Sequence, residues 1–185
     1  MEEKTARRIV NKYLEKRRVR FKMHKEREAG PDFLIDGVAL EVKGSDLDEK
    51  DALTQLTRYA SEYAGLVFAI PVDRLNLTLL YGLYYLEAAT KHLDLLNPRL
   101  IKILLLHEAE GNEHGYFAKE YESTEALLKE IQTKLATRAR LPYDTKPEQV
   151  VSMVAHQVLD VVAIIQIMIA EELVSFQDVY EVHLD

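Results

Sequence analysis

The stretch PDFLIDGVALEVKG, residues 31–44, constrains the fold of this chain more than any other part of the sequence. Asp36 and Gly37 stand between two runs of alternating apolar residues, which is the strongest local signal for a β-hairpin with a two-residue type I′ turn. A turn at these two positions fixes the pairing, because the numbers of opposed residues must add up to 73. The predicted pairs are Ile35 with Val38, Leu34 with Ala39, Phe33 with Leu40, and Asp32 with Glu41.

The predicted hairpin gathers its charged residues on one face, because side chains alternate along a strand. Asp32, Glu41 and Lys43 share this face with Leu34 and Ala39. The other face is apolar throughout and consists of Phe33, Ile35, Val38, Leu40 and Val42.

Two carboxylates opposite each other in a ladder repel one another, so Asp32 and Glu41 need a cation if both stay ionised. Mg²⁺ and Mn²⁺ are hard ions that prefer oxygen ligands and also accept phosphate oxygens. An ammonium group beside them, such as that of Lys43, can orient a water molecule and stabilise charge on a phosphoryl group. The face therefore suggests metal-assisted phosphodiester hydrolysis, and a solvated charged surface is the alternative that the hairpin alone leaves open.

The rest of the chain predicts an α/β protein. A helix over residues 2–18 follows from apolar residues at helical spacing, and a strand over 19–23 can follow it. Ser45 and Asp48 resemble a capping box that opens a helix over 47–63. The further elements expected are a buried strand over 66–70, a buried helix over 75–96, a strand over 101–106, helices over 124–138 and 147–173, and a short strand within 176–184.

The apolar surface of the predicted helix over 147–173 is unusually wide, so this helix needs a surface to pack against. We expect this helix to form the interface of a homodimer, since an enzyme that hydrolyses both strands of a duplex would need two sites. The domain organisation expected is a core over residues 1–120 and a helical carboxyl-terminal extension over 121–185, packed on the core or on a dimer partner.

The charge of the chain is distributed unevenly. The net charge is −7, yet residues 1–28 hold eleven Lys and Arg against five Glu, whereas residues 141–185 hold one Lys against eight acidic residues. Such polarity predicts that the amino-terminal half meets phosphate and the carboxyl-terminal helices meet protein. The expected phosphate-contacting residues are Arg7, Arg8, Lys12, Arg17, Arg18, Arg20 and Lys22.

Several classes of protein are disfavoured by what the sequence lacks. There is no cysteine, which excludes disulfides and cysteine-ligated metals, and there is neither a serine-hydrolase elbow nor a P-loop motif. The first residues, MEEKTARRIV, lack the apolar region of a secretory signal, so the expected location is the cytoplasm.

Two motifs resemble a known superfamily. Pro31-Asp32, followed after eight residues by Glu41-Val42-Lys43, resembles the signature of the PD-(D/E)xK nucleases, which share the restriction-endonuclease-like fold. Gln55-Leu56-Thr57-Arg58-Tyr59 resembles the QLxxY motif of RecB-like exonucleases and of the nuclease domains of type I restriction subunits. The resemblance covers residues 1–106 and implies a mixed-sheet core of order α-β-β-β-α-β, here with carboxyl-terminal helices added.

The resemblance also implies a Mg²⁺ or Mn²⁺ ion and a role for individual residues. Asp32 and Glu41 would be metal ligands, the Val42 carbonyl a further ligand, Lys43 the catalytic lysine, and Gln55 and Tyr59 would position substrate or the hairpin. Many members add an acidic residue from the first helix; Glu3 is the preferred candidate and Glu2 is nearly as good.

The function implied is that of a Mg²⁺- or Mn²⁺-dependent DNA endo- or exonuclease. A Holliday-junction resolvase fits the size and the expected dimer, whereas a RecB-like exonuclease fits the QLxxY motif better, and the sequence does not choose between them or between DNA and RNA. The alternative is a catalytically inactive assembly or regulatory subunit on the same scaffold, suggested by the acidic carboxyl end and the apolar helical surface.

Overall fold

The computed structural model describes residues 1–24, 30–92, 101–108, 115–139 and 179–184. In these residues the chain forms one mixed seven-stranded sheet and four α-helices. The elements are α1 (Glu3–Lys16), β1 (Lys22–Met23), β2 (Phe33–Ile35), β3 (Val38–Val42), α2 (Glu49–Glu62), β4 (Gly65–Pro71), a 3₁₀ turn η1 (Val72–Arg74), α3 (Leu77–His92), β5 (Ile101–Glu108), β6 (Gly115–Tyr121), α4 (Thr124–Ala139) and β7 (Val179–His183).

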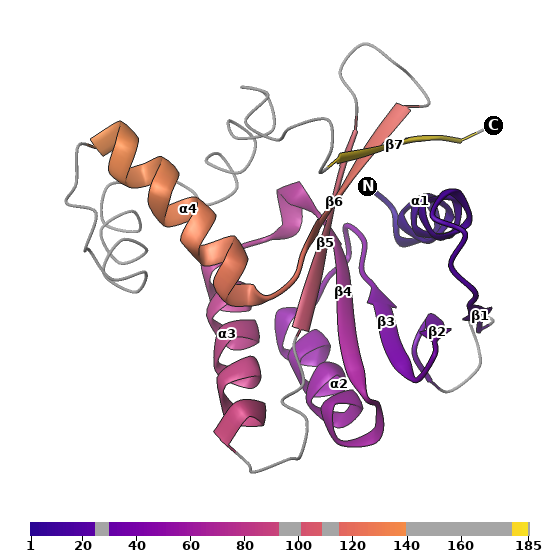
Figure 1. Ribbon diagram of the computed structural model, residues 1–185, viewed down its shortest axis with the longest axis horizontal. Coiled ribbons are helices and arrows are strands. Elements are labelled where there is room, and N and C mark those ends of the chain that lie inside the picture. Colours follow the sequence, from indigo (N-terminus) through magenta and orange to yellow (C-terminus); the bar gives the residue numbers. More distant parts are fainter. Residues whose placement is uncertain (25–29, 93–100, 109–114, 140–178, 185) are drawn as a thin grey trace.

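The sheet lies between two layers of helices. Its strands follow the order of the chain, with β3, β4 and β5 parallel and all other neighbours antiparallel. Helix α1 covers one face, and α2, α3 and α4 cover the other (Figure 1). Both faces of the central strands are therefore buried, as is usual for parallel strands, and each face has an apolar cluster of its own.

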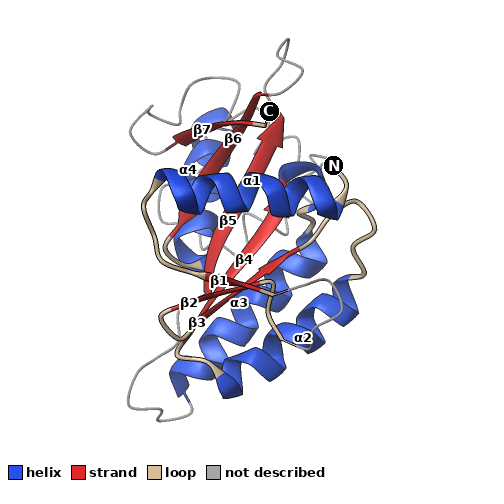
Figure 2. Ribbon diagram, turned by 90° about the vertical axis from the view of Figure 1, so that its right-hand side faces the viewer, coloured by secondary structure: helices blue, strands red, loops and turns tan. Residues whose placement is uncertain are grey.

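Helix α1 lies across the sheet (Figure 2), and its packing follows from its sequence. Five apolar residues recur at three- or four-residue intervals and form one buried stripe, namely Ala6, Ile9, Val10, Tyr13 and Leu14. At the far end of this stripe the Tyr13 hydroxyl donates to Glu120 Oε2 on β6 at 2.5 Å. Glu120 also binds Arg17 and Lys102. This polar cluster fixes the carboxyl end of α1 to β6.

The hairpin is confirmed, and so is its register. Asp36 and Gly37 both have positive φ, +46° and +84°, as a type I′ turn requires. The observed pairs are Ile35 with Val38, Leu34 with Ala39, and Phe33 with Leu40.

The predicted pairing of Asp32 with Glu41 is not part of this ladder, which ends at Phe33 and Leu40. The backbone carbonyl of Asp32 instead accepts a hydrogen bond from the His24 N–H, just beyond β1. Asp32 therefore reaches β3 through its side chain and not as a ladder partner.

The start of α2 differs from the prediction. The N-cap is Asp48, whose side chain accepts a hydrogen bond from the Asp51 N–H at 2.9 Å, so Ser45 is not the cap and the helix begins at Glu49. The helix then connects β3 to the parallel strand β4, which completes the observed order α1-β1-β2-β3-α2-β4.

The second half of the chain contains a strand that the sequence did not predict. Strand β6 pairs with β5, and β7, which lies in the predicted strand region over 176–184, pairs with β6. The expected elements corresponding to α3, β5 and α4 are confirmed. Strands from both sides of the predicted boundary at residue 120 thus share one sheet.

Two expectations cannot be compared with the structure because they fall outside the described residues. They are the helix over 147–173 and the dimer contact assigned to it. Within the described part, no helix is long and apolar enough to cross a membrane.

Candidate active site

The charged residues of the hairpin meet α1 and α2 at the carboxyl end of β3. The close approach of α1 depends on Gly44, which directly follows Lys43. A Cβ atom at Gly44 would lie 2.2 Å from the backbone nitrogen of Glu3 and 2.6 Å from its Cα. The absence of a side chain at Gly44 therefore lets the first turn of α1 rest on the end of β3.

Glu41 is the most buried carboxylate of this group, with 4% of the residue exposed. Its Oε1 accepts a hydrogen bond from Lys43 Nζ at 2.7 Å, whereas Oε2 is buried and has no hydrogen-bond partner within the described part of the chain. Burial, together with the negative charge of Asp32, raises the pKa of Glu41 to about 7. A buried carboxylate oxygen with no donor is a suitable ligand for a cation.

A chain of hydrogen bonds connects Glu41 to α2. Lys43 Nζ also donates to Gln55 Oε1 at 2.8 Å, and Gln55 Nε2 donates to the hydroxyl of Tyr59 at 3.0 Å. Burial by itself lowers the pKa of Lys43, but the charge and the hydrogen bond of Glu41 outweigh it, so that the pKa is raised. Lys43 is therefore an ammonium group held in place by Glu41 and Gln55, and it is not a proton acceptor.

Both oxygens of the Asp32 carboxylate are engaged. Oδ2 accepts a hydrogen bond from the Val42 N–H at 2.8 Å, and Oδ1 forms an ion pair with Arg7 Nη1 at 2.9 Å. Burial raises the pKa of Asp32 despite the opposing effects of Val42 and Arg7. The hydrogen bond to β3 brings Asp32 close enough to Glu41 for the two charges to repel each other.

Of the two candidate acids from the first helix, Glu3 faces the site and Glu2 does not. Burial and the charge of Asp32 raise the pKa of Glu3, and Lys43 acts on it in the opposite direction. Glu2 is exposed at the N-cap position of α1. Glu3 is thus the better candidate, although its role as a metal ligand stays a prediction.

The structure brings together Asp32, Glu41, Lys43, Gln55 and Tyr59, the residues that the two motifs single out. In the described ranges, however, no three His, Cys, Asp or Glu side chains converge tightly enough to enclose a metal ion. A Mg²⁺ ion needs only one or two carboxylates, because it keeps several water ligands. Asp32 and Glu41 meet that requirement, and the orphaned Oε2 of Glu41 fits it.

Sequence reasoning missed the position of Arg7. It was expected on the phosphate-contacting surface, but its side chain is only 13% exposed and points to Asp32. The signal was present, because Arg7 follows Glu3 by four residues and so shares its face of α1. Arg17, expected on the same surface, is bound to Glu120. Arg7 and Arg17 therefore both form ion pairs with carboxylates that lie outside α1.

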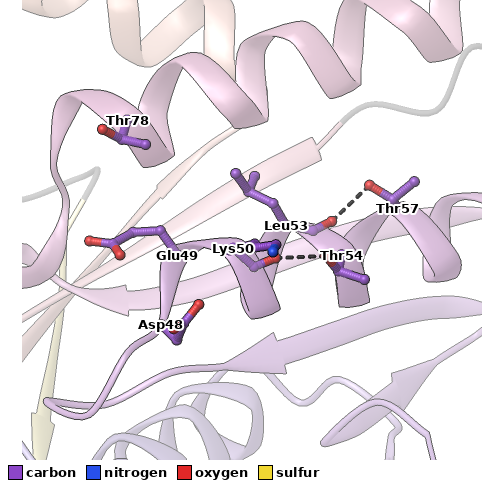
Figure 3. Close-up of a pocket in the computed structure, with 7 residues that line it drawn as sticks. All are labelled: Asp48, Glu49, Lys50, Leu53, Thr54, Thr57 and Thr78. Carbon is purple, nitrogen blue, oxygen red and sulfur yellow. Dashed lines mark hydrogen bonds between the residues drawn. The ribbon is translucent and has the colours of Figure 1, made fainter.

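A separate hollow of about 590 Å³ lies between α2 and α3 (Figure 3). Two of its hydroxyl groups donate within α2 itself, that of Thr54 to the Lys50 carbonyl and that of Thr57 to the Leu53 carbonyl. None of Asp32, Glu41, Lys43, Gln55 and Tyr59 lines it. The hollow is therefore distinct from the candidate active site.

Comparison with known proteins finds no match to this chain among protein-family models, curated proteins or solved structures.

Proposed function

We propose that this chain is a Mg²⁺- or Mn²⁺-dependent nuclease of the PD-(D/E)xK type that hydrolyses phosphodiester bonds in DNA. The observation that carries the proposal is the environment of Glu41, a buried carboxylate with one oxygen bound to Lys43 and the other without a donor in the described chain. The resemblance of the two motifs and the order of the first six elements support it.

Each residue has a distinct part in the proposed reaction. Asp32, Glu41 and the Val42 carbonyl would hold the ion, which supplies Lewis-acid stabilisation of the charge on the phosphoryl group. The Lys43 ammonium orients the attacking water and stabilises the same charge. The side-chain oxygen of Gln55 accepts a hydrogen bond from Lys43, and its amide nitrogen donates to the Tyr59 hydroxyl. Because Tyr59 holds the nitrogen, the oxygen stays turned toward the ammonium. The Gln55–Tyr59 pair therefore positions Lys43.

A row of cations on α1 supports a nucleic-acid substrate. Lys4, Arg8, Lys12 and Lys16 are exposed and follow each other at four-residue intervals, which places them in a stripe along the outer surface of the helix. The stripe begins beside the site, because Glu3 rests on Gly44. Positive charges in such a row can follow the phosphates of one strand.

Cleavage of linear, single-stranded, circular and branched DNA, and of RNA, in Mg²⁺ or Mn²⁺ tests the proposal. We expect Lys43→Met to lower the cleavage rate about a hundredfold or more, as removal of a charge-stabilising donor does in other enzymes. Glu41→Gln should do the same because it weakens ion binding. Lys50→Met, which removes an exposed lysine from α2, is the matched control and should cleave like the wild type.

Equal cleavage by the wild type and by both site variants would mean that any activity comes from elsewhere, and the proposal would fail.

One observation favours the second candidate, a non-catalytic protein on the same scaffold. Both oxygens of Asp32 already have partners in Arg7 and the Val42 N–H. Titration calorimetry with Mn²⁺ distinguishes the two. A saturable heat that disappears in Asp32→Asn supports the nuclease, whereas no such heat supports the non-catalytic protein.

A further inference from the structure

The ion pair between Arg7 and Asp32 has a consequence for metal binding, and this inference rests on the proposed function. Arg7 and a divalent ion would need the same carboxylate. Both paired side chains are 13% exposed, so the two cations would meet in a poorly solvated place where like charges repel more strongly than in water. We propose that Arg7 competes with the divalent ion for Asp32, so that the guanidinium leaves Asp32 when the ion binds.

The position of Asp32 does not depend on Arg7. The Val42 N–H on β3 donates a hydrogen bond to Asp32 Oδ2 at 2.8 Å, and the His24 N–H donates to the backbone carbonyl of Asp32 at 2.9 Å. Loss of Arg7 would therefore remove a positive charge from the site while leaving the carboxylate in place. This distinguishes Arg7 from a residue that orients a ligand, whose removal weakens metal binding.

Arg7 also has a second anchor that can retain it after release. Its Nη2 donates to the His24 carbonyl at 2.6 Å, outside the carboxylate group. The guanidinium can thus leave Asp32 and remain beside the site. Glu3, whose pKa responds to the charges of both Arg7 and Asp32, is a second carboxylate near it.

The first test compares Mn²⁺ affinity by titration calorimetry in the wild type, Arg7→Met and Arg7→Lys. We expect Arg7→Met to bind Mn²⁺ about tenfold more tightly, which is within the range usual when one bound group changes the affinity for another. Arg7→Lys keeps the charge and should stay close to the wild type. Lys50→Met removes the same charge from an exposed position on α2 and is the matched control, expected to bind as the wild type does.

A structural role for Arg7 makes the opposite prediction. If Arg7 only orients Asp32, Arg7→Met should bind Mn²⁺ some 10–100-fold more weakly. Weaker or unchanged binding in Arg7→Met would overturn the inference and leave the metal-dependent function standing. Absence of Asp32-dependent binding in both the wild type and Arg7→Met would overturn both.

A second measurement uses the wild type alone and so does not depend on the folding of a variant. Because Asp32 and the His24 carbonyl hold the guanidinium of Arg7, we expect its hydrogens to give separate nuclear magnetic resonance signals in the absence of the ion. Titration with Mg²⁺, which is diamagnetic, should merge or shift these signals in step with binding. Arg7 signals that do not change at saturating Mg²⁺ would show that the ion pair persists, and the competition would be refuted.

Discussion

The raised pKa of Glu41 makes the candidate site a source of instability that depends on pH. Folding moves this pKa from its ordinary value of 4.5 to about 7. Because the pKa is raised in the folded state, the stability linked to Glu41 is fully present below about pH 4.5 and is lost as the pH rises through about 7. At about 1.4 kcal/mol per pH unit, the loss amounts to about 3 kcal/mol.

Glu41→Gln removes this titration while keeping an oxygen that can accept from Lys43. We would measure the free energy of unfolding by denaturant, in the presence of a chelator, from pH 4.5 to 8. At pH 4.5 the wild type and Glu41→Gln should have similar free energies of unfolding. At pH 8 we expect the variant to be more stable than the wild type by about 3 kcal/mol. Glu62→Gln, an exposed change at the end of α2, is the control and should follow the wild-type curve. A constant difference between wild type and Glu41→Gln over this range would refute the reasoning.

Three further predictions concern the surroundings of the site. Gly44→Ala should lower the free energy of unfolding by about 1–3 kcal/mol in denaturant unfolding, because its Cβ would collide with the Glu3 backbone. Gly65→Ala would meet only ordinary contacts and serves as control. Glu120→Gln should cost about 1–3 kcal/mol at neutral pH; because the pKa of Glu120 is lowered despite burial, this cost should shrink in acid. Tyr59→Phe removes the hydroxyl that Gln55 binds, and a loss of about 1 kcal/mol with little change in Mn²⁺ affinity is the expected calorimetric result.

The parts of the fold that were predictable from sequence are those that local chemistry dictates. Two positive φ angles in succession are costly for most residues, so Asp36-Gly37 sets a type I′ turn and thereby the hairpin register. The buried stripe of α1 likewise follows from residue spacing alone. The side chains of Glu41, Lys43, Gln55 and Tyr59 could be grouped in advance because a strand and the next helix carry them at fixed intervals.

Other features depend on information that a local pattern does not contain. Ser45 and Asp48 each have an acidic residue three positions later, so the sequence fits a helix start at either place. Strand β6, with the sequence GYFAKEY, follows a polar stretch containing glycine, and its pairing with β5 is a tertiary contact. The ion pair between Arg7 and Asp32 is also a tertiary contact, since it depends on how α1 crosses the end of the sheet.

The balance of charge at the site connects these features to the proposed substrate. Four carboxylates, those of Glu3, Asp32, Glu41 and the exposed Asp46, act together with two cations, Arg7 and Lys43, so the group carries two net negative charges when all six are ionised. One divalent ion would cancel that charge, because it adds two positive charges. A site that is negative alone would repel a phosphodiester, whereas the ion would remove that repulsion and offer the phosphate oxygens a positive centre. The acidic composition of the chain is for this reason compatible with a nucleic-acid substrate, provided that the ion binds first.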